Sequence, residues 1–244
     1  MDDRKGLRRR TGVRRDLLFI LLAVIPWRIF HKPDSCSQSH ASRSFRLLSL
    51  GPFFVIIVIV LVVNVHNVVT YSHERSGFDW GGHVEYIRYV ASKWRAPVAT
   101  DGWEMFQPPL YYFLSAIIYR LFGGQAAEPG SLKAVQIMGM LSGVANACFA
   151  LLVLRKLFKK NYLIQILGFS VVAFLPMCFY MNPLISNEIF SGSVISLAIC
   201  LLILYGFGKQ IRIYHAIILG AAVGLALLSK YTAFFVNVVY HGVF

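Results

Sequence analysis

The feature that most constrains this sequence is a series of apolar runs, each close to or longer than the roughly 18 residues that cross a lipid bilayer as a helix. The first clear run covers residues 47–71, and its β-branched stretch 55–63 suits contact with lipid. Lipid offers the backbone no hydrogen-bond partner, so such runs must form helices. We therefore predict an all-α, polytopic membrane protein with five to six transmembrane helices and two juxtamembrane helices in a large first external loop.

The basic residues predict how the chain is oriented. The formal net charge is +13, and much of the excess lies in the tail 1–15, the linker 31–46 and the loops 155–160 and 208–212. Positively charged loops stay in the cytoplasm, so we assign all four to that side. This assignment makes segment 16–30 interfacial or re-entrant, although it could also be the apolar core of a signal peptide. The cytoplasmic position of the four basic segments explains their charge, so no nucleic acid partner is predicted.

Charge also predicts whether the chain crosses the membrane an odd or an even number of times between two loops. The loop after residue 71 is then external and the loop 155–160 is cytoplasmic, so an odd number of spans separates them. The short segment 109–122 is therefore expected to be a juxtamembrane helix. The remaining spans are expected at residues 135–154, 162–182, 189–207 and 213–229, with 231–244 starting a return.

Two regions follow from this scheme. Residues 1–46 form a basic cytoplasmic tail and interfacial segment, and residues 47–244 form a transmembrane module with the external loop 72–134. The chain stops inside an apolar run, so we expect this module to be incomplete. The scheme also brings three polar groups to the external side, at Asp79, at residues 182–188 and at residues 229–232.

The polar interval 78–112 is the best candidate for the chemistry. It holds four of the 11 acidic residues and three of the four tryptophans. It begins with D-W-G-G-H at residues 79–83, and a helical pattern follows with Val84, Ile87 and Trp94 on one face. Pro97 is expected to end that helix, and Pro108-Pro109 to start a second one over about residues 110–122.

The order of these motifs resembles a known group of enzymes. A first span, then Asp79 and His83 as D-x-x-x-H, then an amphipathic helix and Q-P-P-L-Y-Y resemble the GT-C type membrane glycosyltransferases. More narrowly, they are similar to the protein-mannosyltransferase and aminoarabinose-transferase group, or glycosyltransferase family 39. Two positions differ, since Trp80 stands where the group has Glu and Gln107 where it has His. The run G-L-A-L-L-S-K ending at Lys230 also resembles a motif of that group.

The resemblance implies a glycosyltransferase that moves a sugar from a polyprenyl-phosphate carrier to a lipid, glycan or protein acceptor. The transfer would take place on the external face of the cell membrane, with the endoplasmic reticulum membrane as the alternative. Asp79 and Glu188 are the expected catalytic carboxylates, because a carboxylate can deprotonate the attacking hydroxyl or amine. The expected substrate-binding residues are His83, Arg88, Glu104, Gln107, Lys230 and Tyr231.

Each of these residues also has an ordinary structural explanation. Glu188 could be an acid placed for a helix dipole, and Lys230 could be a lysine that reaches from a span end to the interface. The four cysteines show neither a disulfide framework nor a metal-binding spacing. No cofactor is implied, and a divalent cation between Asp79 and Glu188 remains open.

Two other functions compete with the enzyme. The chain could be a non-catalytic membrane protein that acts as an assembly partner. It could also be a transporter, but transporters place ionisable groups within their spans and pair broken helices in repeats. The spans here carry almost no charge, which disfavours a transporter.

The orientation can be tested with single cysteines. A cysteine replacing Ser76 should react with a membrane-impermeant thiol reagent added outside intact cells, and one replacing Lys159 should react only after permeabilisation. Labelling of the Lys159→Cys protein from outside would overturn the assignment.

Overall fold

The structure is a computed structural model that describes residues 50–72, 77, 79–206 and 212–235. The chain divides into two compact units, residues 1–45 and residues 46–244, and only the second contains described residues. The predictions for the basic tail and for segment 16–30 lie outside the described residues, as does most of the return expected over 231–244.

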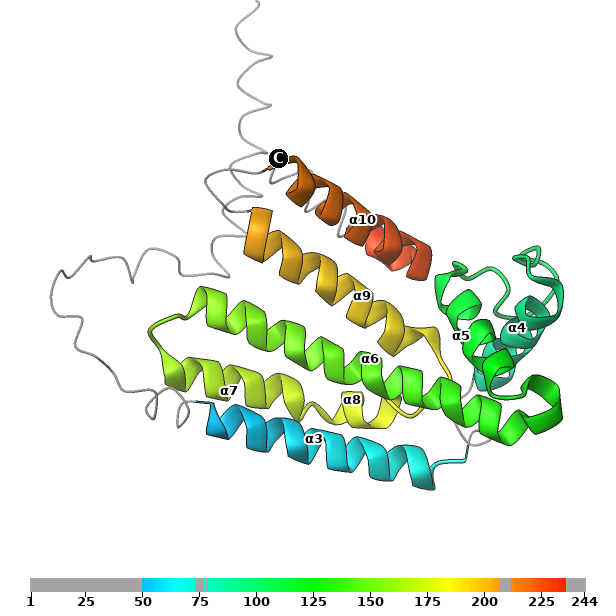
Figure 1. Ribbon diagram of the computed structural model, residues 1–244, viewed down its shortest axis with the longest axis horizontal. Helices are drawn as coiled ribbons and strands as arrows, with labels where there is room; N and C mark the ends of the chain where they lie inside the picture. The colour runs from blue at the N-terminus through cyan, green and yellow to red at the C-terminus, as the bar shows by residue number, and fades with distance from the viewer. Residues whose placement is uncertain (1–49, 73–76, 78, 207–211, 236–244) are drawn as a thin grey trace, which may run out of the picture. The chain divides into compact units, whose positions relative to one another are not determined.

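The second unit is a bundle of helices (Figure 1). α6 packs against α3, α7 and α9, and α9 packs against α10. Among the described residues, three helical segments are long and apolar enough to cross a membrane, namely Gly51–Thr70, Gly124–Leu157 and Asn187–Gly206. The prediction of an all-α membrane protein is confirmed. The bundle helices are α3 (Gly51–Thr70), α6 (Glu128–Leu157), α7 (Tyr162–Ala173), α8 (Pro176–Met181), α9 (Asn187–Leu201) with the π-helical turn η4 (Leu202–Gly206), and α10 (Ile213–Ser229).

The expected span 162–182 is not continuous. α7 ends at Ala173 and α8 begins at Pro176, while Leu175 between them is extended, with φ −60° and ψ 116°. Proline has no N–H to continue the helix and pushes the preceding residue out of the helical region. The chain therefore bends before it reaches residues 182–188.

The polar interval forms two short helices, α4 (Trp80–Lys93) and α5 (Leu110–Leu121), followed by the 3₁₀ turn η3 (Gly124–Ala127). Both lie at the end of the bundle where α3 and α10 finish and α6 and α9 begin (Figure 1). Their apolar sides pack together through Val84, Ile87, Tyr112 and their neighbours. The expected short helices at 110–122 and after Gly82 are therefore present.

One expectation for α4 was wrong. Trp94 does not continue its buried face, because the helix ends at Lys93 and Trp94 takes a left-handed conformation with φ 51°. That turn directs the indole outward, where it is 48% exposed and where the Arg120 guanidinium lies 5.0 Å from the ring centre. The buried face is formed instead by residues His83, Val84, Tyr86, Ile87 and Val90.

A buried asparagine ties three parts of the bundle together. Asn182 follows α8, is 2% exposed and donates from Nδ2 to Asn64 Oδ1 of α3 at 2.8 Å. Its side chain lies where a Cβ at Gly143 of α6 would be, so only glycine fits there. Gln136 of α6 adds a bond from Nε2 to the Pro183 carbonyl at 2.8 Å. These contacts fix where the link to α9 begins.

The Gly143 contact gives a stability prediction. Gly143→Ala places a methyl group onto the Asn182 amide, so we expect unfolding to become easier by about 1–3 kcal/mol, as for other overpacked sites. Gly224→Ala in α10 is the matched control, because a Cβ there meets nothing within 4 Å. Thermal unfolding in detergent should give a lower midpoint for the first variant only. Equal midpoints would show that Asn182 can move away.

Candidate functional site

Seven polar residues from four segments meet at one end of the bundle, and we call them the end cluster. Direct contacts link Glu104 to Gln107, Gln107 to Asn187, and Glu188 to Lys230. Asp79 and His83 lie at the start of α4, where Gly82 meets the Glu104 side chain, and the charges of Asp79, Glu188 and Lys230 all act on His83. The end cluster is Asp79, His83, Glu104, Gln107, Asn187, Glu188 and Lys230.

The start of α4 places Asp79 at the rim of the end cluster. Its carbonyl accepts the His83 N–H at 3.2 Å, so Asp79 is the last residue before the helix, and its side chain is exposed. A Cβ at Gly82 would lie 2.8 Å from Glu104 Cγ, so a residue without a side chain lets the loop 101–107 approach α4. Gly81 has no such contact. The second glycine of D-W-G-G-H therefore brings Glu104 toward Asp79.

His83 is buried against the tyrosines of Q-P-P-L-Y-Y. It is 4% exposed, and its Nδ1 lies 2.8 Å from the Tyr112 hydroxyl. Tyr112 stacks on Tyr86 with ring centres 3.7 Å apart. Burial lowers the pKa of His83 to about 4, although Asp79 and Glu188 oppose the change. The imidazole is therefore neutral near pH 7, and its Nδ1 is already used to join α4 to α5.

Glu104, Gln107 and Asn187 form a chain of side-chain hydrogen bonds. Gln107 donates from Nε2 to Glu104 Oε2 at 3.2 Å and accepts from Asn187 Nδ2 at 3.3 Å. Glu104 is 5% exposed, and this burial raises the pKa of its carboxyl, while the bond from Gln107 opposes the rise and the charge of Asp79 adds to it. Asn187 is 1% exposed and its Oδ1 has no partner among the described residues. This chain holds the polar loop on the start of α9.

Glu188 and Lys230 form an ion pair between α9 and α10. The backbone of Lys230 is extended, with φ −160° and ψ 139°, so Lys230 leaves the line of α10 as the helix ends. Ser191 holds the two helices together by donating to the Ser229 carbonyl at 3.0 Å. The Glu188 side chain is half exposed and that of Lys230 is mostly covered. The ammonium group is thus held at the end of the bundle.

Arg88, a predicted site residue, makes its contacts away from the end cluster. Arg88 donates from Nε to Glu128 Oε1 at 2.6 Å, and Tyr119 donates to the same oxygen at 2.9 Å. This pair lies on another side of α4, so the structure does not bring Arg88 to the end cluster. Tyr231 directly follows Lys230 and is 65% exposed.

The sequence did not single out Tyr112 or Asn187 as members of the site. Tyr112 belongs to the Q-P-P-L-Y-Y run, so its motif was visible, but its contact with His83 spans 29 positions in the chain. Among the described residues, no group of three or more His, Cys, Asp or Glu side chains is placed to hold a metal ion.

The end cluster offers two kinds of chemistry. An exposed carboxylate at Asp79 can accept a proton from a nucleophile. The Lys230 ammonium has three N–H donors, so it can bind an anionic group while it stays paired with Glu188.

A model of the family described as dolichyl-phosphate-mannose-protein mannosyltransferase matches residues 106–242. The matched region begins just before Gln107 and includes Glu188 and Lys230. Comparison with curated proteins and with solved structures finds no match.

The buried His83 predicts how stability depends on pH. The pKa of His83 is 6.5 in the unfolded chain and about 4 in the folded chain. At a pH between these two values, the imidazole binds a proton in the unfolded chain and not in the folded one. Stability from this group is therefore complete above pH 6.5 and falls toward pH 4, by up to about 3 kcal/mol. The His83→Gln variant should lose less stability over this range when unfolding midpoints are measured at a series of pH values. Parallel curves for parent and variant would contradict the buried neutral imidazole.

Proposed function

The chain belongs to the dolichyl-phosphate-mannose-protein mannosyltransferase family, and we propose that it transfers a sugar on the external face of its membrane. Members of this family are GT-C type glycosyltransferases that depend on a polyprenyl-phosphate-linked sugar. The acceptor is a lipid, a glycan or a protein. The observation that carries this proposal is the end cluster, which gathers a carboxylate and a lysine at one end of an apolar bundle.

The proposed side of the membrane is supported by the two ends of α6. Its first residue, Glu128, lies beside α4 and α5, and its last turn carries Arg155 and Lys156. Lys159 and Lys160 follow directly in the link to α7. Positive residues favour the cytoplasmic side, so the end cluster belongs on the opposite side. That side is the exterior in a cell membrane and the lumen in an endoplasmic reticulum membrane.

Asp79 is the proposed general base. The acceptor hydroxyl or amine attacks the anomeric carbon of the sugar and gives its proton to Asp79. The bond from that carbon to the phosphate oxygen breaks, and its electrons leave with the polyprenyl phosphate. The phosphate is a good leaving group, so no second general acid is required. The exposed position of Asp79 at the start of α4 supports this role.

Lys230 is proposed to hold the phosphate of the carrier. The leaving phosphate gains one negative charge during transfer, and a fixed ammonium group stabilises that charge as it develops. Glu188 is proposed to position the ammonium through the ion pair between α9 and α10. Glu104, Gln107 and Asn187 are proposed to bind hydroxyl groups of the sugar or acceptor, because their amide and carboxyl groups lie next to the charged residues.

Asp79→Asn tests the base. It preserves size and polarity but cannot accept the proton, so transfer should fall by about 100- to 10,000-fold while carrier binding persists. Transfer is measured with purified protein, a radiolabelled polyprenyl-phosphate sugar and membrane extract as the source of acceptor. Asp101→Asn is the control, since Asp101 lies in the link between α4 and α5 and its side chain accepts from the Val98 N–H. Near-normal transfer by Asp79→Asn would move the base to Glu104 or Glu188.

Lys230→Met tests the phosphate contact. It keeps the length of the side chain and removes the charge, so polyprenyl phosphate should bind about 10- to 100-fold more weakly, the usual loss for a charge-assisted hydrogen bond. Titration calorimetry with polyprenyl phosphate measures the change. Unaltered binding would remove Lys230 from the site. Carrier binding without transfer, in the parent as well as in the variants, would favour the non-catalytic assembly partner.

A further inference from the structure

The end of the bundle opposite the end cluster carries a small basic hollow. At that end α6 finishes, and α7 and α3 begin (Figure 1). The hollow has a volume of about 310 Å³, and its lining comes from the end of α6, the link and the start of α7, namely Arg155, Lys159, Lys160, Tyr162 and Gln165. This volume is at the lower end of the range of about 300–1,000 Å³ that is usual for small-molecule sites, which suits a single headgroup.

Hydrogen bonds hold the link between α6 and α7 in place. The Phe158 carbonyl accepts from the Asn161 N–H at 3.0 Å and from Gln165 Nε2 at 2.7 Å. The Asn161 side chain also caps the first turn of α7. The backbone of Lys159 and Lys160, which lie inside this short turn, is therefore fixed beside the hollow.

One aromatic ring positions the rest of the hollow. The Arg155 guanidinium lies 5.3 Å from the centre of the Phe53 ring of α3, and Tyr162 packs edge-on against the same ring with centres 5.5 Å apart. No described residue accepts a hydrogen bond from Arg155, so its N–H donors are available to a ligand. Lysine has a flexible four-carbon stem, so the ammonium groups of Lys159 and Lys160 can turn toward an anion held at that guanidinium.

The described residues do not balance the positive charge of the hollow. Arg155, Lys159 and Lys160 form no ion pair within the described part of the chain. The acidic residues that the structure describes all belong to the other end of the bundle, and they are Asp79, Glu85, Asp101, Glu104, Glu128 and Glu188. Since arginine and lysine bind phosphate through charge-assisted hydrogen bonds, the hollow favours a phosphate group.

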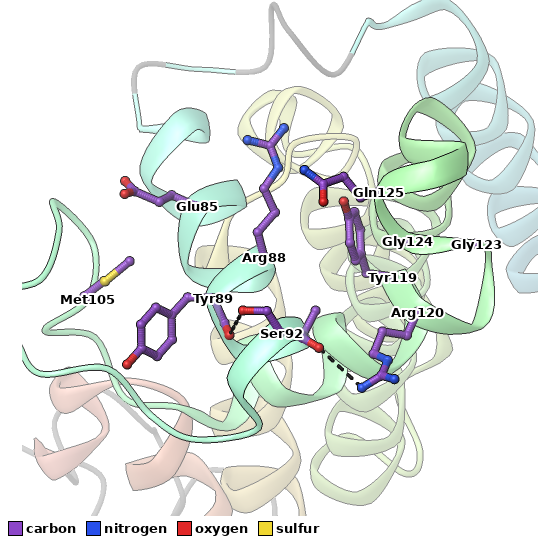
Figure 2. Close-up of a pocket in the computed structure, with 11 residues that line it drawn as sticks. Glu85, Arg88, Tyr89, Ser92, Met105, Tyr119, Arg120, Gly123, Gly124 and Gln125 are labelled. Atoms are coloured by element: carbon purple, nitrogen blue, oxygen red, sulfur yellow. Dashed lines mark hydrogen bonds between the residues drawn. The ribbon is translucent and has the colours of Figure 1, made fainter.

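The larger groove beside α4 lacks this concentration of charge. It has a volume of about 700 Å³ and is lined by residues of α4, α5 and η3 (Figure 2). Arg88 is paired there with Glu128, and Figure 2 shows its guanidinium and that of Arg120 directed to different ends of the groove. The basic hollow is therefore the better anion site.

The surface next to the basic hollow is apolar and exposed. Leu163, Leu167 and Val171 lie four residues apart on one face of α7 and are 64%, 56% and 69% exposed. In a membrane protein such a face lies against lipid tails, and a tyrosine at a helix end is typical of the headgroup layer. Leu163 directly follows Tyr162 of the hollow, so a phosphate that carries its own apolar tails fits both surfaces.

We propose that this hollow binds the phosphate of an anionic membrane phospholipid. Arg155, Lys159 and Lys160 hold the phosphate, and the tails lie along the exposed face of α7. Basic pockets between helices on the cytoplasmic side of a membrane suit anionic headgroups, and this end of the bundle is the one that we assign to the cytoplasm. The site does not depend on the proposed sugar transfer, and its occupancy is measured without any sugar or acceptor.

The orientation of the protein alone would not require such a site. A cytoplasmic loop needs only positive charge, wherever its side chains point. Lys156 shows the difference, because it donates to the Leu204 carbonyl at 3.4 Å and does not line the hollow.

Native mass spectrometry of the purified protein tests the site. The protein is incubated with equal amounts of dioleoyl phosphatidylglycerol and dioleoyl phosphatidylcholine, which share their tails and differ in net charge, and the retained lipid is counted. The parent should retain mainly the phosphatidylglycerol. The double variant Lys159→Gln/Lys160→Gln should reduce that retention by about 10- to 100-fold, the effect of removing two basic residues beside an anionic lipid. Lys156→Gln is the matched control, because it removes a charge from the same run outside the hollow.

A charge-preserving variant separates binding from folding. Lys159→Arg/Lys160→Arg should retain phosphatidylglycerol as the parent does, and the unfolding midpoints of both double variants should equal that of the parent, because the two lysines are exposed. Equal retention of the two lipids by the parent would overturn the proposal, as would an equal loss in Lys156→Gln. Displacement of the lipid by inorganic phosphate at the same concentration would make the hollow a site for free phosphate and would also overturn it.

Discussion

The contact of Asn182 with the glycines of α6 determines much of the arrangement around the end cluster. A Cβ at Gly139 would lie 2.9 Å from the Asn182 carbonyl oxygen, and one at Gly143 would overlap its side chain. Asn64 satisfies the Nδ2 donor of Asn182, and leaving a buried donor unpaired costs about 1–3 kcal/mol, whereas Asn182 Oδ1 has no partner among the described residues. The bond to Asn64 therefore fixes α3, α6 and the link after α8 as a unit. Asn187 and Glu188 follow within a few residues, so their positions depend on this contact.

The membrane explains why the chemistry gathers at an end. Lipid-embedded helices must satisfy their backbone internally and cannot expose charges to hydrocarbon at low cost. Carboxylates and lysines are therefore confined to helix ends and loops, where water and headgroups are present. In this bundle α3 and α10 finish, and α6 and α9 begin, at the same end (Figure 1). Residues that are far apart in the sequence meet there as a result.

Much of this could be predicted from the sequence because it depends on local patterns. Apolar length predicted the helices, and the prolines before Leu110 predicted the start of α5. The resemblance placed Asp79, His83 and Gln107 in one candidate site, and their roles stay predictions. The role of Arg88 stays a prediction, and the spacing along α4 did not reveal that its guanidinium pairs with Glu128.

The features that the sequence could not predict are contacts between distant segments. Trp94 ends α4 in a left-handed conformation, and no local signal in the sequence specifies its contact with Arg120. Pro176 could be seen in the sequence as a helix breaker. The sequence did not show that Asn182, six residues later, packs against Gly139 and Gly143 of α6. Helical periodicity predicts which residues share a face, whereas the identity of the partner on each face comes only from the packed structure.

Because α4 is one stiff helix, the positions of the residues at its start and in its later turns are coupled. The helix has 14 residues, and a helix of that size extends about 21 Å. Asp79 just before the helix and His83 in its first turn belong to the end cluster, and its later turns carry Arg88 and Ser92 into a groove beside α5. A helix is stiff over this length, so any contact that holds its groove side also limits how far Asp79 can move from the membrane surface. The buried bond between His83 and Tyr112 connects the same helix to α5. The Arg88–Glu128 ion pair and the His83–Tyr112 contact hold α4 at two places, which would keep the proposed base in one position for the proposed transfer.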